Sequence, residues 1–219
     1  MWLAEFAYAT YHFGMAEMTD CPDLAKRGPG RPRSDATRCA ILKAAYELLE
    51  EGGMANFTIE GVAARSGSAK TTIYRWWPNK GALAMESLLG VAETLSPFPE
   101  TESARVDLRD HLHLYAQALR GRAGKLLVGI VAEAQKDPAT RDAFVARYMA
   151  PRRQAARHLL ERGIARGEFR PGLDIEGICD ALYGFFYLRL LFGHGAMDAA
   201  AVDQVLDIVM SGIEARAAA

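Results

Sequence analysis

Apolar residues recur along the chain at the three-to-four-residue spacing of amphipathic helices, and no stretch shows the strict alternation of a strand. From about Ser34 an apolar stripe of Ile41, Leu42, Ala45, Leu48 and Leu49 predicts a first helix that ends at Gly52-Gly53. The same periodicity predicts further helices near 58–66, 68–77, 79–95, 103–120, 125–136, 139–166, 174–192 and 198–215. The pattern therefore predicts an all-α protein of about nine helices.

Residues 58–80, TIEGVAARSGSAKTTIYRWWPNK, predict two short helices around a tight turn. Thr58 can cap the first helix, and Gly67 at its end accepts the left-handed backbone that a sharp turn needs. A second helix then begins near Ser68, and Pro78 and Asn79 end it and cap the next. This arrangement is typical of helix-turn-helix DNA-binding proteins.

The second of these helices carries side chains suited to DNA. Donors and methyl groups for phosphates and base edges come from Lys70, Thr71, Thr72 and Arg75. Ile73 and Trp77, four residues apart, share the face that packs inward. An ordinary solvated helix face would carry similar residues, so the charge around them decides between the two interpretations.

Charge is distributed unevenly along the chain. Residues 26–85 contain ten Lys and Arg against five Asp and Glu, a net charge of +5, whereas the whole chain has −1. The rest of the chain therefore carries −6. A basic N-terminal third is the electrostatic footprint expected where a polyanion binds.

In this segment the chain resembles the tetracycline-repressor (TetR) family of bacterial transcription regulators. The resemblance covers about residues 36–96 and rests, in order, on Thr58, Ala63, Gly67, Tyr74, Trp77 and Lys80. It implies an N-terminal three-helix DNA-binding domain followed by a helical ligand-binding and dimerisation domain. It also implies that Tyr74 and Lys80 bind backbone phosphates, while residues 70–72 face the major groove.

Two positions depart from the family's pattern. Ser68-Ala69 replaces an apolar residue followed by Ser, which predicts that Ser68 caps the second helix. Trp76 stands where the family often has His, and its indole can donate one hydrogen bond or stack. The sequence leaves the role of Trp76 open.

A basic arm, KRGPGRPR at residues 26–33, precedes the first helix, and its prolines and glycines oppose helix formation. Its Gly-Arg-Pro core resembles an AT-hook, so we expect Arg31 and Arg33 to insert into the minor groove; a solvated linker is the alternative. The expected DNA-binding residues are therefore Arg31, Arg33, Thr58, Ser68, Lys70, Thr71, Thr72, Tyr74, Arg75 and Lys80.

The domains are expected at 1–33 (extension with basic arm), 34–96 (helix-turn-helix domain) and 97–219 (ligand-binding and dimerisation domain), with Pro97 and Pro99 at the junction. Residues 1–25 contain no Lys or Arg, which argues against a secretory signal, and they are too broken to span a membrane. Met15 and Met18 lie where a shorter chain could begin. Residues 1–17 are thus either an overlong start or a helix that caps a dimer.

The last two predicted helices carry more apolar surface than one partner helix needs. Because a symmetric DNA reader requires two copies, we expect a homodimer, and core packing is the alternative for any one residue. The expected interface residues are Leu182, Phe185, Leu190, Val202, Val205, Val209 and Ile213. By resemblance the C-terminal domain also holds a small apolar effector, for which the candidate residues are His111, Tyr115, Phe144, Tyr148 and Phe186.

Enzymatic motifs are missing from the sequence. Gly121-Arg122-Ala123-Gly124-Lys125 lacks the remaining residues of a phosphate-binding loop, and Asp107 and His111 have no further metal ligands nearby. We therefore expect no catalytic residues, no metal and no cofactor. The absence of a membrane-spanning run favours a cytoplasmic protein.

Together these features predict a ligand-responsive transcription regulator, a repressor that binds a palindromic operator as a homodimer. Two alternatives stay open. One is an activator or constitutive DNA binder with the same fold. The other is a helical small-molecule-binding protein or enzyme whose helix-turn-helix is vestigial. The sequence names neither the effector nor the operator.

Overall fold

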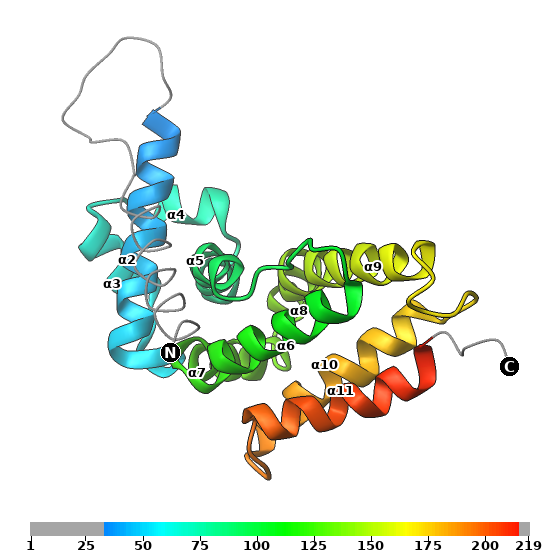
Figure 1. Cartoon of the computed structure of the whole chain (residues 1–219). Helices are drawn as coiled ribbons and strands as arrows, with labels where there is room; N and C mark the ends of the chain where they lie inside the picture. Colours follow the sequence, from blue (N-terminus) through cyan, green and yellow to red (C-terminus); the bar gives the residue numbers. More distant parts are fainter. Residues whose placement is uncertain (1–32, 215–219) are drawn as a thin grey trace, which may run out of the picture. The chain divides into compact units, whose positions relative to one another are not determined.

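The computed structural model describes residues 33–214. These hold α2 (Arg33–Asn56), α3 (Ile59–Ser66), α4 (Lys70–Trp76), α5 (Lys80–Leu95), α6 (Ala104–Arg120), α7 (Arg122–Ala134), α8 (Pro138–Phe144), the π-helical turn η1 (Val145–Met149), α9 (Ala150–Ala165), α10 (Ile175–Phe192) and α11 (Ala199–Ile213), as Figure 1 shows. Because α8, η1 and α9 are continuous, this part of the chain has nine helical segments and no strand beyond one bridge between Phe169 and Glu214. The predicted all-α fold is confirmed.

The described residues separate into two compact units. Unit 1 contains residues 33–95 and 125–148, and unit 2 contains residues 96–124 and 149–214. The first boundary, after Leu95, lies beside the junction that Pro97 and Pro99 indicate. Residues 125–148 belong to the first unit with the helix-turn-helix, although the sequence pattern places them with the C-terminal helices.

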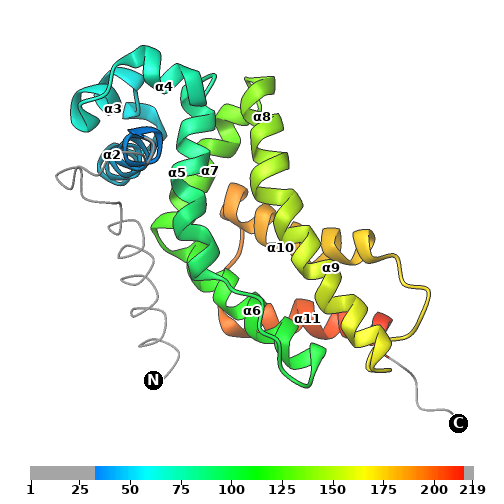
Figure 2. The same cartoon turned by 90° about the horizontal axis from the view of Figure 1, so that it is seen from above.

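In unit 1, α2 packs against α3 and α5, which lie beside it in Figure 2. The predicted α2 stripe is buried at Ile41, Ala45 and Leu49, each at most 1% exposed. Gly53, with φ 62° and ψ −174°, interrupts α2 where the glycine pair predicts an end, but helical structure resumes as far as Asn56. Burial of each large apolar side chain contributes about 1.5–3 kcal/mol.

The predicted long helix over 139–166 contains a π-helical turn, η1, between α8 and α9. Pro151 lies in the first turn of α9 and has no backbone N–H to donate to the carbonyl four residues earlier, that of Arg147. A proline at this position therefore accounts for the local loss of regular α-helical bonding, which a π turn accommodates.

In unit 2 a buried carboxylate fixes the start of α6. Asp107 is 0% exposed and accepts hydrogen bonds from the Thr101 backbone N–H at 3.0 Å and hydroxyl at 2.6 Å. It also pairs with Arg162 of α9. A buried charge is tolerated only when it is paired in this way, so these contacts fasten residues 99–107 to α9.

Glu168 supplies a second cap to the same helix. Its carboxylate accepts hydrogen bonds from the Ala104 N–H at 2.9 Å, the Arg105 N–H at 3.2 Å and the Ser103 hydroxyl at 2.8 Å. These bonds satisfy free donors at the helix N-terminus, where the dipole favours an anion.

In the described part of the chain, no helix is long and apolar enough to cross a membrane.

Candidate DNA-binding site

The turn between α3 and α4 has the geometry that the sequence predicts. Thr58 adopts an extended backbone, and its hydroxyl accepts a hydrogen bond from the Gly61 N–H at 3.1 Å. Gly67 is left-handed at φ 66° and ψ 20°, and its N–H bonds to the Ala63 carbonyl. The Ser68 N–H reaches the same carbonyl at 3.2 Å. These bonds close α3 and reverse the chain within three residues.

The cap of α4 differs from the prediction. The helix begins at Lys70, and its capping residue is Ala69, which makes no side-chain cap bond. The Ala69 carbonyl instead accepts the N–H groups of Thr72 at 2.9 Å and Ile73 at 3.2 Å. The assignment of Ser68 as the cap is therefore wrong: the backbone of Ser68 closes α3, and the chain enters α4 one residue later.

The two faces of α4 are divided as predicted. Ile73 is 0% exposed and Trp77, which follows the helix, is 1% exposed. The opposite face is exposed at Lys70, Thr71, Tyr74 and Arg75, while Thr72 and Ser68 are half-buried. Tyr74, a large aromatic residue, is 51% exposed. An exposed tyrosine between two cations suits a surface that meets a partner.

The indole of Trp76 holds one of the exposed cations, Arg75, in place. The Arg75 guanidinium lies over the Trp76 ring, 5.0 Å from its centroid. Trp76 in turn packs edge-on against Trp77, with ring centroids 5.6 Å apart. The buried Trp77 thus positions Trp76, which supports Arg75 on the exposed face by a cation–π contact.

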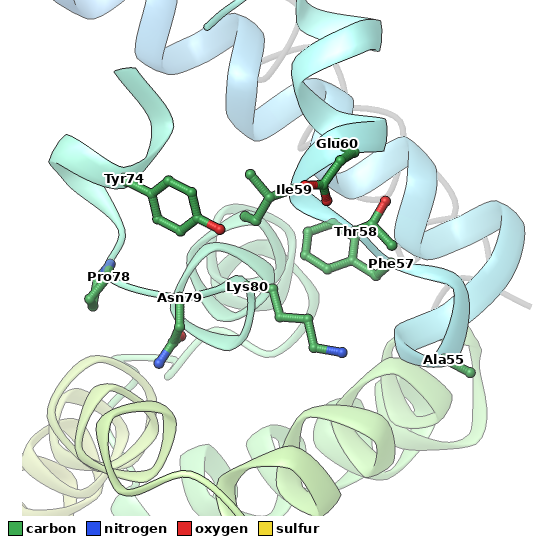
Figure 3. A pocket seen from close by; sticks show the side chains of 9 residues that line it. All are labelled: Ala55, Phe57, Thr58, Ile59, Glu60, Tyr74, Pro78, Asn79 and Lys80. Carbon is green, nitrogen blue, oxygen red and sulfur yellow. The ribbon is translucent and has the colours of Figure 1, made fainter. Parts of the chain in front are cut away.

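A hollow of about 360 Å³ lies where the start of α3, the end of α4 and the start of α5 meet. Figure 3 shows its lining of Ala55, Phe57, Thr58, Ile59, Glu60, Tyr74, Pro78, Asn79 and Lys80. Three of these, Thr58, Tyr74 and Lys80, come from the sequence motif and supply two hydroxyls and one ammonium group. The hollow is large enough for a phosphate group and offers it hydrogen-bond donors.

Carboxylates lie beside the cations of this surface. Glu60 accepts a hydrogen bond from Lys70 at 2.9 Å, which lowers the pKa of Glu60 and raises that of Lys70. Lys80 Nζ lies 3.8 Å from Glu133 Oε1. Two of the cations that the sequence assigns to DNA, Lys70 and Lys80, therefore have carboxylates of the chain itself beside them.

Glu86 of α5 joins several parts of unit 1, and sequence reasoning missed it. The Trp77 Nε1–H donates to Glu86 Oε2 at 3.0 Å, and the same carboxylate pairs with Arg38 of α2 and Arg147 of η1. Glu86 is 10% exposed at its side chain. One carboxylate thus ties the end of the second helix of the motif to α2, α5 and η1.

Asn79 caps α5 as predicted, since its Oδ1 accepts the Ala82 N–H at 2.7 Å. Its Nδ2 donates to Asp137 Oδ2 at 2.6 Å, and Asp137 caps α8 by accepting the Thr140 N–H at 2.8 Å. The Asp-Pro sequence at 137–138 is a helix-start signal that could have indicated this second cap. The link between the two caps has no local sequence signal.

Of the predicted basic arm, only Arg33 lies within the described residues. Arg31 lies outside the described residues. Arg33, predicted as the last residue of an extended arm, is the first residue of α2.

The five effector candidates divide between the two units. His111, Tyr115 and Phe186 meet in unit 2: Tyr115 stacks near His111 at 6.1 Å and meets Phe186 edge-on at 5.2 Å. Phe144 and Tyr148 stack on each other at 5.2 Å in unit 1. All five are buried.

His111 has a defined protonation state. Its Nδ1 lies 2.9 Å from the Pro97 carbonyl and its Nε2 lies 2.9 Å from the Tyr183 hydroxyl. A carbonyl can only accept, so Nδ1 carries the proton and Nε2 accepts from Tyr183. Burial lowers the pKa of His111 to about 4, and the imidazole is neutral at physiological pH.

The predicted interface residues also divide. Leu182, Val202 and Ile213 are 1%, 0% and 4% exposed, so their side chains pack in the core of unit 2. Four others, Phe185, Leu190, Val205 and Val209, are half-buried. The sequence pattern misses the most exposed apolar side chains of these helices, which are Leu188, Leu191, Phe192 and Ile208.

Residues 41–86 match the family described as "Bacterial regulatory proteins, tetR family", and residues 98–209 match "Tetracyclin repressor-like, C-terminal domain". The chain is 38% identical over 190 residues to the uncharacterized HTH-type transcriptional regulator YdeS of Bacillus subtilis, covering 86% of this chain and 96% of that protein. It is 26% identical to the DNA-binding transcriptional repressor TetR of Mycobacteroides abscessus, covering 81% and 94%.

A solved structure of the TetR family transcription regulator SCO0332 has the same fold. Its TM-score is 0.73 at 35% identity, covering 80% of this chain and 97% of that one. The motif of residues 58–80, the helical fold and these matches agree. The chain belongs to the TetR family of helix-turn-helix transcriptional regulators.

Proposed function

We propose that this regulator is a repressor that binds a palindromic operator as a homodimer and is released by a small-molecule effector. The observation that carries the DNA-binding part is the meeting of Thr58, Tyr74 and Lys80 around one hollow beside the exposed face of α4. Such a regulator acts on bacterial DNA, so the proposal places it in the cytoplasm.

The side chains around the hollow have two roles in this proposal. Tyr74 and Lys80, with Thr58, hold backbone phosphates and so fix the position of the protein on the duplex. The exposed start of α4 enters the major groove, where Lys70 and the Thr71 and Thr72 side chains meet base edges. Arg75, supported by Trp76, adds a cation at the edge of this surface.

A second copy of the chain is supported by the apolar surface of α10 and α11. Leu188, Leu191 and Phe192 are 53%, 40% and 73% exposed on α10, and Ile208 of α11 is 72% exposed. The two helices lie side by side (Figure 1). Several large apolar side chains exposed on two neighbouring helices are typical of interaction sites. A two-fold dimer would place two recognition helices about one DNA turn, roughly 34 Å, apart.

The effector site that we propose lies around the aromatic cluster of unit 2. His111, Tyr115 and Phe186 are joined there by Tyr183, whose ring meets Tyr115 edge-on at 5.5 Å. Apolar rings with a neutral imidazole and two hydroxyls suit a ligand that is mostly hydrophobic and carries a few polar groups. Phe144 and Tyr148 belong to unit 1 and are not needed for this site.

Within unit 1, residues 125–148 contact the helix-turn-helix at several places, of which the Lys80–Glu133 pair is one. Asp137 bonds to Asn79, next to Lys80, and Arg147 pairs with Glu86, which holds Trp77. A displacement of residues 125–148 would therefore change the positions of Lys80 and Trp77, at both ends of the DNA-binding surface.

Binding of effector and of DNA must be coupled reciprocally. An effector that favours a DNA-incompetent arrangement must weaken DNA binding by the same factor by which DNA weakens effector binding.

The proposal is tested by titrating the purified protein into duplexes taken from the DNA that flanks its own gene. We expect saturable binding of two protomers per duplex. The logarithm of the association constant should fall linearly with the logarithm of the salt concentration. A scrambled duplex of equal length is the control and should bind more weakly. A folded protein that binds none of the flanking duplexes better than the scrambled one would refute the proposal.

A further inference from the structure

Two carboxylates of the chain form ion pairs with lysines that the proposed function assigns to DNA. Glu60 of α3 and Lys70 of α4 face each other across the turn of the motif, with Nζ and Oε1 2.9 Å apart. Glu133 of α7 lies 3.8 Å from Lys80 at the start of α5. Each lysine therefore has a carboxylate of the same chain beside it, hydrogen-bonded in the case of Lys70.

The position of Glu60 makes this pairing relevant to DNA. Glu60 lines the same hollow as Thr58, Tyr74 and Lys80, and Figure 3 shows it on the α3 side of that hollow. Its side chain is 67% exposed, and that of Lys70 is 54% exposed. A phosphate that enters the hollow thus meets a carboxylate within the Debye length of about 8–10 Å that applies at physiological salt.

We propose that Glu60 and Glu133 act as internal phosphate mimics, which hold Lys70 and Lys80 in the free protein and keep its affinity for all DNA low. The inference rests on the proposed function, because it assumes that these lysines meet DNA. Its physical basis is competition: each lysine must exchange a carboxylate oxygen for a phosphate oxygen or a base edge, so the net electrostatic gain of each contact is reduced.

This competition has a signature in the salt dependence. A protein that neutralises Z phosphates shows a slope of log affinity against log salt of about −0.9Z. A carboxylate that stays beside its lysine at the DNA surface lowers the effective Z. Removing the carboxylate should therefore steepen the slope by up to about 0.9 for each residue. A variant that only loses folding stability would leave the slope of its folded fraction unchanged.

The test uses the full-length Glu60→Gln and Glu133→Gln variants with an operator duplex and a scrambled duplex over a range of salt concentrations. We expect each variant to bind both duplexes about two- to fivefold more tightly at low salt, the range set by exposed ion pairs. We also expect a steeper slope, with the double variant steepest. Glu60→Asp, which keeps the charge, should keep the wild-type slope.

A matched control is Glu102→Gln, which removes the same charge from an exposed position in unit 2. It should change neither affinity nor slope by a comparable amount. If the Gln variants bind with the wild-type slope, or bind more weakly because Glu60 supports Lys70 in the complex, the mimic proposal is overturned while the DNA-binding proposal stands. If the wild-type protein binds no duplex, the DNA-binding proposal itself fails.

Discussion

Asn79 Nδ2 donates a hydrogen bond to Asp137 Oδ2 at 2.6 Å, although the two residues are 58 positions apart in the sequence. Each caps a different helix, Asn79 the start of α5 and Asp137 the start of α8. One bond between two caps therefore joins the DNA-binding helices to residues 125–148. Lys80, the proposed phosphate anchor, follows Asn79 directly.

Replacing Asn79 by Ala should destabilise unit 1. The variant loses the cap of α5 and the bond to Asp137, for a total of about 2 kcal/mol. Chemical denaturation of the variant and the wild type measures the difference. A useful comparison is Asn79→Asp, which keeps a capping oxygen but sets a second carboxylate against Asp137. It should be less stable than wild type at neutral pH and should regain stability as acid protonates the pair.

Gly81 allows α5 and α8 to approach closely. A methyl group at this position would overlap the side chain of Thr140. Gly81→Ala should therefore cost about 1–3 kcal/mol through overpacking. Gly184 of α10 is the comparison, because a methyl group added there would have no neighbouring atom within 4 Å. Gly184→Ala should therefore stabilise the protein by about 0.5–1 kcal/mol.

A double variant separates close packing from other causes at Gly81. Thr140→Ala removes the two nearest atoms that the new methyl group would overlap, Oγ1 and Cγ2, and leaves Cβ, at the expense of the Thr140 hydrogen bond to Asp137. We expect Gly81→Ala with Thr140→Ala to be less destabilised than the sum of the single variants. Strict additivity in urea denaturation would show that the contact is not what makes Gly81 sensitive.

Stability should depend on pH through His111. Its pKa is about 4 when folded, because burial disfavours the imidazolium, against 6.5 for the free side chain. The unfolded chain therefore binds more protons between pH 6.5 and 4, so the free energy of unfolding falls as the pH drops through this window. The loss should be on the order of 3 kcal/mol.

The matching variant is His111→Gln, which has no titrating ring. Its unfolding free energy, measured by denaturation at pH 7, 6, 5 and 4, should vary less than that of the wild type. The difference between the two curves isolates His111 from the carboxylates that titrate in both proteins. Parallel curves would mean that His111 has the same pKa in the folded and the unfolded chain, so that burial does not hold its imidazole neutral.

Much of the DNA-binding unit could be predicted from sequence because its signals are local. Thr58 as a cap, Gly67 in the left-handed region, and Ile73 with Trp77 on the buried face all follow from spacing and residue type. The predicted cap at Ser68 failed although the cause is also local: the backbone of Ser68 completes the hydrogen bonding at the end of α3, and α4 begins one residue later.

The remaining features depend on residues that are distant in sequence. Glu86 gathers Trp77, Arg38 and Arg147, and no spacing rule indicates such a cluster. The apolar residues of α10 and α11 also do not indicate by their spacing which face of each helix packs in the core of unit 2 and which is exposed. Leu182 and Val202 were therefore expected at the interface and lie in the core, while Phe192 lies at the surface.

Charged residues on the exposed surface of α10 should prevent dimerisation. Leu188→Glu combined with Phe192→Glu would place two carboxylates in the apolar contact, and burying unpaired charges is strongly unfavourable. Analytical ultracentrifugation should show a monomer for this variant and a dimer for the wild type. Val106→Glu, at a 47% exposed apolar position on α6, is the control and should remain dimeric. A dimer that persists in the double variant would place the interface elsewhere.

The central claim is that the surface formed by α3, α4 and the start of α5 binds DNA, and the most direct test combines Tyr74→Phe with Lys80→Ala. Affinities for an operator and a scrambled duplex should be measured by fluorescence anisotropy across a range of salt. If Tyr74 and Lys80 hold phosphates, both affinities should fall by similar factors and the salt slope should become shallower by about 1. Unchanged affinity and slope in a folded double variant would contradict the account.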